Sequence, residues 1–434
     1  MAASYLRRGM TGPATFSLFV RRLPNSRGFL VCAGVEECLD FLAGFQFREE
    51  DLRYLRDIMG MDAKTVAAFA AMRFTGDAWA VPEGRVVFAG EPILEVTAPI
   101  AEAQVVETYL LNQVTLHTTI ASKAARAVIA ARGRPLVDFS FRRTQGIDAS
   151  MAVARSALMV GFTATSNVEA ARRLDVRSSG TMAHSYIEAF DTELEAFRAY
   201  GEDFREIATF LVDTYDTVDG VRNAITAIAQ LQLDGQLAIR LDSGDLLQLS
   251  RQARQLLDSA GLSRVGIFAS GGVDELLIDE LLSAGAPIDA FGVGTKMGVS
   301  EDAPYLDTAY KLVQYGERPI MKLSPEKTST PGRKQVFRST GGEIEDVIGL
   351  REEPVPAGCE GLLISVMEGG TRTGQRGALD EARERFRADL ARLPAATLAL
   401  RTPTPLEPSY SAELQRLVTS TVQGLRAARA DMPG

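Results

Sequence analysis

The stretch LAIRLDSGD, residues 237–245, places an arginine and an aspartate two positions apart. Alternate residues of a β-strand point to the same face, so Arg240 and Asp242 are expected to project together. A guanidinium there can bind a carboxylate or a phosphate through paired hydrogen bonds. The neighbouring carboxylate suits ribose hydroxyls or Mg²⁺, which prefers oxygen ligands. A structural Arg–Asp pair is the alternative, and the Ser-Gly-Asp turn that follows favours a binding site.

Two glycine-rich turns, SGGVDE at 270–275 and GVGT at 292–295, each follow an apolar run. Glycine lets backbone N–H groups approach an anion closely, and a following helix adds a favourable dipole. Each turn alone is also explained by tight turning, but two in succession resemble the phosphate site of many βα barrels. The candidate phosphate ligands are Ser270, Gly271, Gly272, Gly294 and Thr295.

Aromatic and cationic residues occur together in DFSFRRTQG, residues 138–146. Phe139 offers an aromatic face, and Arg142 and Arg143 offer positive charge, a combination that suits a flat anionic ring. Two arginines on an ordinary surface are the alternative.

Five of the seven lysines lie between residues 296 and 334. Positive charge concentrated in one segment can neutralise a polyphosphate, whereas a solvated basic loop is the alternative. The candidate ligands in this segment are Lys296, Lys322 and Lys327.

His184 is one of only two histidines, and it follows Gly180 and Thr181 in SGTMAHSY. Since no cysteine or second histidine lies near it in the sequence, we do not expect a zinc site. A histidine at an anion-binding helix start can act as a nucleophile toward phosphate, although a structural role is commoner for a single histidine. We interpret His117, inside a long predicted helix, as ordinary packing.

A series of βα units is predicted to position these residues. Six short apolar runs begin at 134, 176, 208, 237, 265 and 288, with successive spacings of 42, 32, 29, 28 and 23 residues, and helical stretches usually follow them. Continuous apolar runs are typical of buried parallel strands. The candidate residues lie near the carboxyl ends of these runs, where α/β proteins build their sites. At least six units without a G-x-G-x-x-G motif favour an irregular, TIM-like α/β barrel over an open doubly wound sheet.

The rest of the chain predicts a second domain built from both chain ends. We expect an α+β domain over 1–101, the barrel over 102–310, a basic segment that completes the active site over 311–345, and a C-terminal segment over 346–434 that packs on the N-terminal domain.

The composition excludes several classes of function. A net charge of −9 argues against a general nucleic-acid-binding protein. No apolar run is long enough to span a membrane, and the first residues lack the apolar stretch of a signal peptide. The three cysteines are odd in number and lack zinc-ligand spacing, so we expect reduced thiols in a cytoplasmic protein.

Taken together, the motifs resemble those of the nicotinate phosphoribosyltransferases, which are type II phosphoribosyltransferases. The resemblance extends from about residue 14 to residue 338, and it is carried by FRRTQGIDASM, GFTATSNVEAARRLDV, SGTMAHSY, IRLDSGDL, FASGGVDE, FGVGTK and PGRKQVFR. It implies that nicotinate reacts with phosphoribosyl pyrophosphate (PRPP), giving nicotinate mononucleotide and pyrophosphate in NAD salvage. ATP hydrolysis through a phosphohistidine, Mg²⁺, and a homodimer with a shared active site are further implications.

The resemblance also assigns roles to individual residues. It implies that His184 is phosphorylated, that Arg240 faces nicotinate, that Asp242 faces the ribose, and that Phe139 stacks on the pyridine ring. Arg142 and Arg21 would meet PRPP phosphates, and the glycine-rich turns would hold the 5′-phosphate.

Ser166 bears on the choice of substrate. Related nicotinamide enzymes carry an aspartate at the matching position, and that carboxylate would repel the carboxylate of nicotinate by about 4 kcal/mol at 4 Å. A serine hydroxyl donates a hydrogen bond instead. The sequence therefore favours nicotinate over nicotinamide, while a quinolinate enzyme would leave the ATP-linked histidine unexplained.

The N-terminus departs from the family pattern. Family members begin with a Thr-Asp-x-Tyr-Gln stretch whose tyrosine stacks on the ring from the neighbouring subunit, whereas this chain opens at MAASYLRRGM, with Tyr5 in a different context. We expect either an upstream start or weakened nicotinate binding. A catalytically impaired ligand-binding relative is therefore a further alternative.

Overall fold

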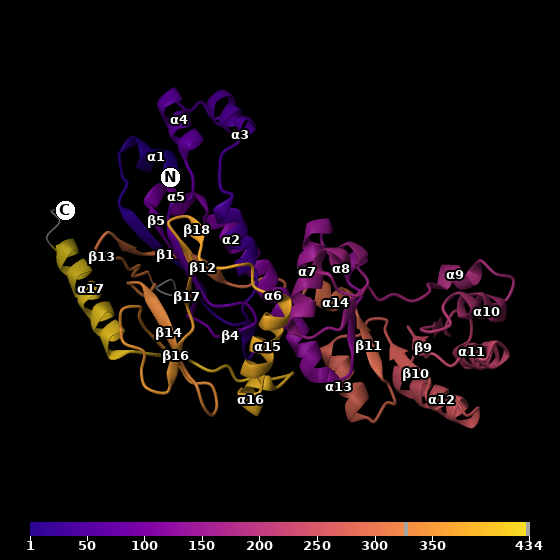
Figure 1. Ribbon diagram of the computed structural model, residues 1–434. Coiled ribbons are helices and arrows are strands. Elements are labelled where there is room, and N and C mark those ends of the chain that lie inside the picture. Colours follow the sequence, from indigo (N-terminus) through magenta and orange to yellow (C-terminus); the bar gives the residue numbers. More distant parts are fainter. Residues whose placement is uncertain (325–328, 431–434) are drawn as a thin grey trace. The chain divides into compact units, whose positions relative to one another are not determined.

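The computed structural model describes residues 1–324 and 329–430. The chain forms two compact units (Figure 1): one combines Met1–Thr119 with Tyr305–Gly434, and the other is the continuous segment Ile120–Pro304. The boundaries predicted from the sequence lie at 101/102 and 310/311. The first division falls inside one uninterrupted helix, α6 (Glu107–Ala131), and such a boundary leaves no turn signal in the sequence.

A six-stranded parallel sheet forms the centre of the 120–304 unit, in which β9, β10 and β11 lie side by side (Figure 1). The continuous apolar runs predicted as buried parallel strands form most of this sheet. In sheet order the strands are β7 (Ala164–Thr165), β6 (Leu136–Asp138), β11 (Ala290–Val293), β10 (Gly266–Ala269), β9 (Ala238–Leu241) and β8 (Thr209–Leu211).

Helices follow the strands closely because capping residues stand just beyond the strand ends. The side chains of Asn167, Asp216, Asp245 and Asp274 each accept a hydrogen bond from a first-turn backbone N–H. The helices of this unit are α7 (Ile147–Val160), α8 (Val168–Leu174), α9 (His184–Glu188), α10 (Glu193–Asp203), α11 (Thr217–Leu231), α12 (Leu246–Ser259), α13 (Glu275–Ser283) and α14 (Thr295–Gly298), with a 3₁₀ turn at Phe141–Arg143.

The predicted parallel α/β fold is confirmed, whereas a closed barrel remains a prediction. Within the described residues, β7 and β8 are the two edges of the sheet and are not paired with each other. The run VRSSGT was predicted as a strand, and this was wrong: it makes only a single bridge, between Ser178 and Thr165. The strand beside β6 is instead β7, which is two residues long and has no recognisable strand pattern in the sequence.

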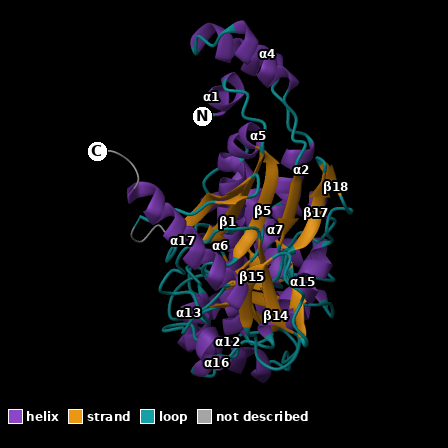
Figure 2. Cartoon of the chain, turned by 90° about the vertical axis from the view of Figure 1, so that its left-hand side faces the viewer, coloured by secondary structure: helices purple, strands orange, loops and turns teal. Residues whose placement is uncertain are grey.

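The other unit is built around an antiparallel seven-stranded sheet. Both chain ends supply strands: β1 pairs with β5 and with β12, and β3 pairs with β17. Figure 2 shows β1 and β5 together with β17 and β18. In sheet order the strands are β13 (Arg318–Pro319), β12 (Thr308–Tyr315), β1 (Pro13–Val20), β5 (Pro92–Pro99), β3 (Asp77–Ala80), β17 (Ile364–Glu368) and β18 (Thr371–Arg372).

Smaller elements complete this unit. A second sheet contains β16 (Cys359–Gly361), β14 (Lys334–Ser339), β15 (Asp346–Leu350) and β19 (Ser409–Tyr410), and a third pairs β2 (Leu30–Val31) with β4 (Val86–Val87). The helices are α1 (Ala2–Arg7), α2 (Val35–Ala43), α3 (Glu49–Arg53), a π-helical turn at Tyr54–Ile58, α4 (Ala63–Ala71), α5 (Ile100–Val105), α15 (Leu379–Leu390), α16 (Ala395–Leu398) and α17 (Ala412–Ala430). Tyr5, the residue in the altered N-terminal context, packs against the core of this unit.

A buried arginine ties the two chain ends together inside this unit. The Arg338 guanidinium, which has no exposed surface, donates to both carboxylate oxygens of Asp346, to Asp389 at 2.9 Å and to the backbone carbonyl of Val86. Glu91 is fully buried in the same region; burial, and then the negative charge of Asp346, hold its pKa well above the usual value. Part of the segment predicted to complete the active site, 311–345, thus contributes internal ion pairs to the core.

Candidate active site

A cavity of about 70 Å³ opens at the carboxyl ends of β6, β9, β10 and β11 in the 120–304 unit. Because these strands are parallel, the residues that follow each one meet at the same edge of the sheet. The lining residues are Phe139, Arg142, Arg143, Arg240, Asp242, Ser270, Gly271, Gly272, Val273, Gly292, Gly294 and Thr295. The structure therefore gathers ten of the residues predicted from sequence at one site.

Arg240, on β9, is held by three neighbours. Its Nε donates to the hydroxyl of Ser270 at 2.7 Å, its Nη1 to the hydroxyl of Thr181 at 2.7 Å, and its Nη2 to Oδ1 of Asp242 at 2.6 Å. The guanidinium carbon lies 5.2 Å from the ring centre of Phe139, within the range of a cation–π contact. The positive charge therefore has a fixed position against an aromatic face.

Asp242 directly follows β9, and its carboxylate belongs to the same hydrogen-bond network. Oδ1 accepts hydrogen bonds from Arg240 and from the Ser270 hydroxyl, which lies 2.5 Å away. The backbone of Gly271 approaches so closely that a Cβ there would lie 1.6 Å from the carbonyl oxygen of Asp242. Gly271 also has a φ of +81°, so the turn requires glycine for both space and conformation.

His184 is the first residue of α9, and its imidazole lies beside the same carboxylate. Nε2 is 3.9 Å from Oδ2 of Asp242, and Nδ1 is 3.1 Å from the hydroxyl of Thr214, which follows β8. The side chain is 42 % exposed, so a substrate can reach it. Thr214 therefore contacts one ring nitrogen and leaves the other nitrogen beside Asp242.

Asp213, just before Thr214, offers a further carboxylate. Its Oδ2 accepts from the backbone N–H of Asp242 at 3.1 Å and from the hydroxyl of Ser243 at 2.5 Å, while its Oδ1 is buried with no hydrogen-bond partner among the described residues. An unsatisfied carboxylate oxygen near Asp242 fits Mg²⁺, which often binds through one or two carboxylates together with substrate phosphates. The part of the chain that is described contains no cluster of three or more metal-ligating side chains.

Ion pairs hold the glycine-rich turn at 270–275. Lys296 donates to Oδ2 of Asp274 at 2.7 Å, and Asp274 also caps α13. Burial alone would raise the pKa of Asp274, but hydrogen bonds from Lys296 and from the Leu277 N–H lower it. Glu275 is buried against Lys123 at 2.8 Å. Lys296 therefore acts on the turn and is not among the residues that line the cavity.

Other predicted residues lie outside the cavity lining. Ser166 follows β7, and its backbone N–H donates to the carbonyl of Asp138 at 2.8 Å. Gly180 is exposed. Thr181 does not line the cavity, but its hydroxyl accepts a hydrogen bond from Arg240. Arg21 and Lys322 belong to the unit formed by both chain ends, and Lys327 lies outside the described residues.

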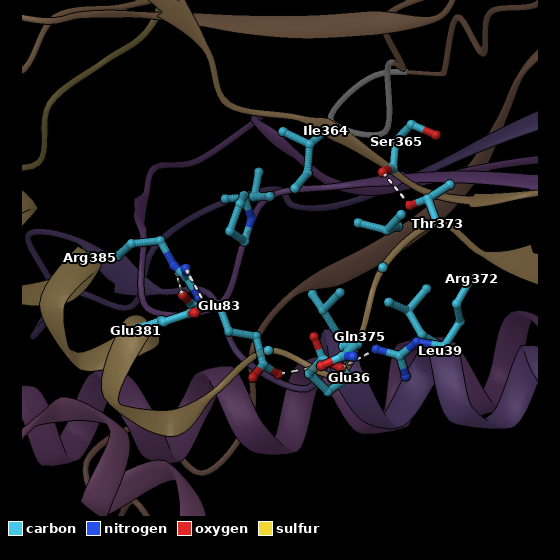
Figure 3. Close-up of a pocket in the computed structure, with 16 residues that line it drawn as sticks. Glu36, Leu39, Glu83, Ile364, Ser365, Arg372, Thr373, Gln375, Glu381 and Arg385 are labelled. Carbon is cyan, nitrogen blue, oxygen red and sulfur yellow. Dashed lines mark hydrogen bonds and ion pairs between the residues drawn. The ribbon is translucent and has the colours of Figure 1, made fainter.

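That unit has cavities of its own. Arg21, which pairs with Asp307 at 2.6 Å, lines a cavity of about 280 Å³ together with Arg22 and Lys334. Figure 3 shows another, of about 230 Å³, with acidic and basic side chains on its walls.

The charged groups of this second cavity pair with one another. Arg372 bonds to Glu36, and Nε of Arg385 donates to the backbone carbonyl of Glu83 at 2.8 Å. These contacts join segments from the two chain ends, so we interpret them as structural.

Several site residues were not selected from the sequence. Val273 and Gly292 line the cavity, and Thr214 contacts the histidine. Asp213, which the sequence does place at the end of an apolar run but without a role, supports the residues after β9. Asp213 and Thr214 directly follow the predicted strand that begins at residue 208. Their place at a strand end was the available signal, because that is where α/β proteins build their sites.

A parallel sheet whose strand ends carry an Arg–Asp pair, glycine-rich turns and an accessible histidine defines an α/β enzyme for anionic, phosphorylated ligands. Two family models match the chain: the nicotinate phosphoribosyltransferase (NAPRTase) N-terminal domain over residues 1–115, and the NAPRTase family over residues 135–341. The chain belongs to the nicotinate phosphoribosyltransferase family, which confirms the family and the enzyme class predicted from its motifs.

Relatives support this assignment across nearly the whole chain. Nicotinate phosphoribosyltransferase pncB2 of Mycobacterium tuberculosis is 47% identical over 399 residues, which cover 91% of this chain and 85% of the relative. The Bacillus subtilis nicotinate phosphoribosyltransferase is 42% identical, covering 82% of this chain and 75% of the relative. The crystal structure of human nicotinic acid phosphoribosyltransferase matches with a TM-score of 0.86 and 28% identity, covering 97% of this chain and 98% of the human chain.

No helix within residues 1–324 and 329–430 combines the length and apolarity needed to span a membrane.

Proposed function

We propose that this protein transfers the phosphoribosyl group of PRPP to nicotinate in NAD salvage, coupled to ATP hydrolysis through His184. The observation that carries the proposal is the Arg240 guanidinium, fixed 5.2 Å from the ring centre of Phe139 and hydrogen-bonded to Asp242 in one cavity. An aromatic face beside a guanidinium suits an anionic pyridine. A carboxylate two residues further along the strand suits a ribose.

Each substrate part has a counterpart in the cavity. Nicotinate would stack on Phe139 with its carboxylate toward Arg240, and the backbone N–H groups of the turns at 270–275 and 292–295 would hold the 5′-phosphate. Arg142 and Arg143 line the same cavity and would neutralise phosphate charge. Ser166 would favour a carboxylate over a carboxamide, because its hydroxyl donates where an aspartate would repel.

Transfer would proceed by attack of the pyridine nitrogen on the anomeric carbon as pyrophosphate leaves. Asp242 would orient the ribose hydroxyls and stabilise positive charge that develops on the sugar. Mg²⁺, held by Asp242 or Asp213 and the substrate phosphates, would supply charge neutralisation for the leaving group.

ATP would act through His184. The imidazole is accessible and lies beside Asp242, so phosphorylation there would add negative charge and acceptor oxygens next to the substrate cavity. The bound phosphoryl group would change PRPP affinity by making different contacts in the two states.

Three further expectations belong to the proposal. The first is that the parallel sheet closes into a barrel. The second is a homodimer in which Arg21, Lys322 and Lys327 serve a shared active site, and the third is a cytoplasmic location. The family relationship and the cation-lined cavity at Arg21 support the second of these.

One assay separates the candidate functions. We expect mononucleotide formation from PRPP with nicotinate, little with nicotinamide or quinolinate, and stimulation by ATP that H184A abolishes. Preferential use of nicotinamide or quinolinate would overturn the substrate assignment, and no turnover with any pyridine would favour an impaired ligand-binding protein. Full ATP stimulation in H184A would exclude coupling through a phosphohistidine at this residue, but it would leave the substrate assignment intact.

A further inference from the structure

Asp138 is a buried carboxylate at the edge of the cavity that the proposed reaction does not use. It is the last residue of β6 and only 1 % exposed, and the next residue, Phe139, lines the cavity. A buried charge is costly unless hydrogen bonds satisfy it. Its contacts therefore indicate what it holds in place.

Asp138 accepts hydrogen bonds from two neighbouring strand ends. Oδ1 accepts from the backbone N–H and the hydroxyl of Ser140, at 2.9 and 2.5 Å, and Oδ2 accepts from the hydroxyl of Thr165 at 2.8 Å. Its carbonyl oxygen accepts from the backbone N–H of Ser166 at 2.8 Å. One residue thus joins the segment that follows β6 to the segment that follows β7.

The carboxylate is held by these donors, since no ion pair involves it within the described part of the chain. Burial raises the pKa of Asp138, and hydrogen bonds from Ser140 and Thr165 oppose this shift only in part. All three contacts of the side chain are donations to its carboxylate oxygens, so these donors fix its orientation.

Asp138 is linked to two residues that the proposed function assigns to nicotinate: Phe139, which lines the cavity, and Ser166, which lies outside its lining. Phe139 is confined by packing: its ring lies 5.7 Å from that of Phe268, and a Cβ on Gly292 would approach it to 2.7 Å. Phe139 and Ser166 belong to different strand ends, so their separation depends on the link through Asp138 and Thr165. Small displacements of substrate-positioning groups can cost about a hundredfold in rate.

We propose that Asp138 is a positioning residue that fixes Phe139 relative to Ser166 and thereby sets the enzyme's discrimination between pyridine carboxylates and carboxamides. This inference rests on the proposed function. It assigns no chemical step to Asp138, which acts on the substrate only through its neighbours.

The test compares T165V, T165S and D138A in steady-state assays with nicotinate and nicotinamide. T165V keeps the side-chain shape but removes the hydrogen bond to Asp138, together with the one that the Asn167 N–H donates to the same hydroxyl. We expect KM for nicotinate to rise about tenfold with a smaller change in kcat, KM for PRPP to stay near wild type, and the nicotinate-to-nicotinamide ratio of kcat/KM to fall by about the same factor. T165S should restore both KM for nicotinate and the substrate ratio. D138A should change both values more than T165V does.

D289A is the matched control. Asp289 lies just before β11, and its carboxylate also joins two neighbouring strands, because it accepts a hydrogen bond from the Ile267 N–H on β10 at 2.7 Å. It should leave the substrate ratio unchanged. An unchanged ratio in T165V, or an equal change in D289A, would overturn the inference while wild-type activity with nicotinate still supported the proposed function. If D138A fails to fold, T165V and T165S decide the question.

Discussion

Nε2 of His184 lies 3.9 Å from Oδ2 of Asp242, although the two residues belong to different βα units. The same carboxylate bonds to Arg240 through its other oxygen. One side chain therefore stands between the predicted nicotinate ligand and the predicted phosphoryl acceptor.

Replacing Asp242 should slow the transfer step. D242N removes the negative charge beside the ribose position, and we expect kcat to fall by on the order of 100- to 1,000-fold. Steady-state assays at saturating PRPP and nicotinate measure this. D245N is the control, since Asp245 caps α12 and asparagine caps equally well. Equal losses in both variants would show that the effect is structural.

Thr214 should control ATP coupling. T214V keeps the side-chain shape but removes the hydroxyl that contacts Nδ1 of His184, a contribution of about 1 kcal/mol. We expect ATP stimulation to fall roughly fivefold, with unchanged turnover in the absence of ATP. T214S should recover the stimulation, and T226V, on the surface of α11, should have no effect. Equal stimulation in T214V and wild type would refute the role.

Alanine substitutions at the two adjacent glycines of the 270–275 turn should have very different effects on activity. Both have positive φ, but a Cβ on Gly271 would collide with the carbonyl oxygen of Asp242, whereas a Cβ on Gly272 meets nothing within 4 Å. G272A should lose about 1–2 kcal/mol of stability from backbone strain alone. G271A should also displace Asp242 and raise KM for PRPP at least tenfold. Thermal unfolding and initial rates measure both, and similar kinetics for the pair would contradict the close approach.

Glu91 should make stability depend on pH. Its folded-state pKa lies well above the unfolded value of about 4.3. Its contribution is therefore complete at pH values below the unfolded pKa, and it is lost as pH rises through the folded pKa. E91Q avoids this loss, so its melting temperature relative to wild type should rise by about 2–4 °C or more between pH 4.5 and pH 8. E345Q, at an exposed carboxylate, should track wild type at every pH.

Much of the site could be predicted because it depends on strand ends. The spacing in LAIRLDSGD was enough to place Arg240 and Asp242 on one face, and parallel pairing then brought the turns at 270–275 and 292–295 beside them. The ligand assigned to each residue remains a prediction. The contact of Thr214 with His184 joins two turns that lie 30 residues apart in the sequence. The hydrophobic pattern of the sequence does not predict such a contact between side chains.

The fold was harder to predict where elements are short or internally polar. β7 contains two residues, too few for a pattern of alternation, so the VRSSGT run further along the chain was taken as a strand instead. The sequence places Lys334 and Arg338 in the basic segment predicted to complete the active site. They lie on β14 and are buried, because Asp346 on the neighbouring strand β15 and the distant residues Glu95 and Asp389 neutralise them.

The pairing of β1 with β12 and of β3 with β17 has a consequence for biosynthesis. As the nascent chain leaves the ribosome, β1 and β3 emerge early, but their partners follow only after residues 120–304 have been translated. That intervening segment is continuous and can fold first. Until then, β1 and β3 each have an unpaired backbone edge, and such an edge can pair with another chain and promote aggregation. Translation that stalls just after residue 304 would therefore leave a protein in which the unit with the candidate site is complete, while β1 and β3 still lack their partner strands and are exposed to chaperones.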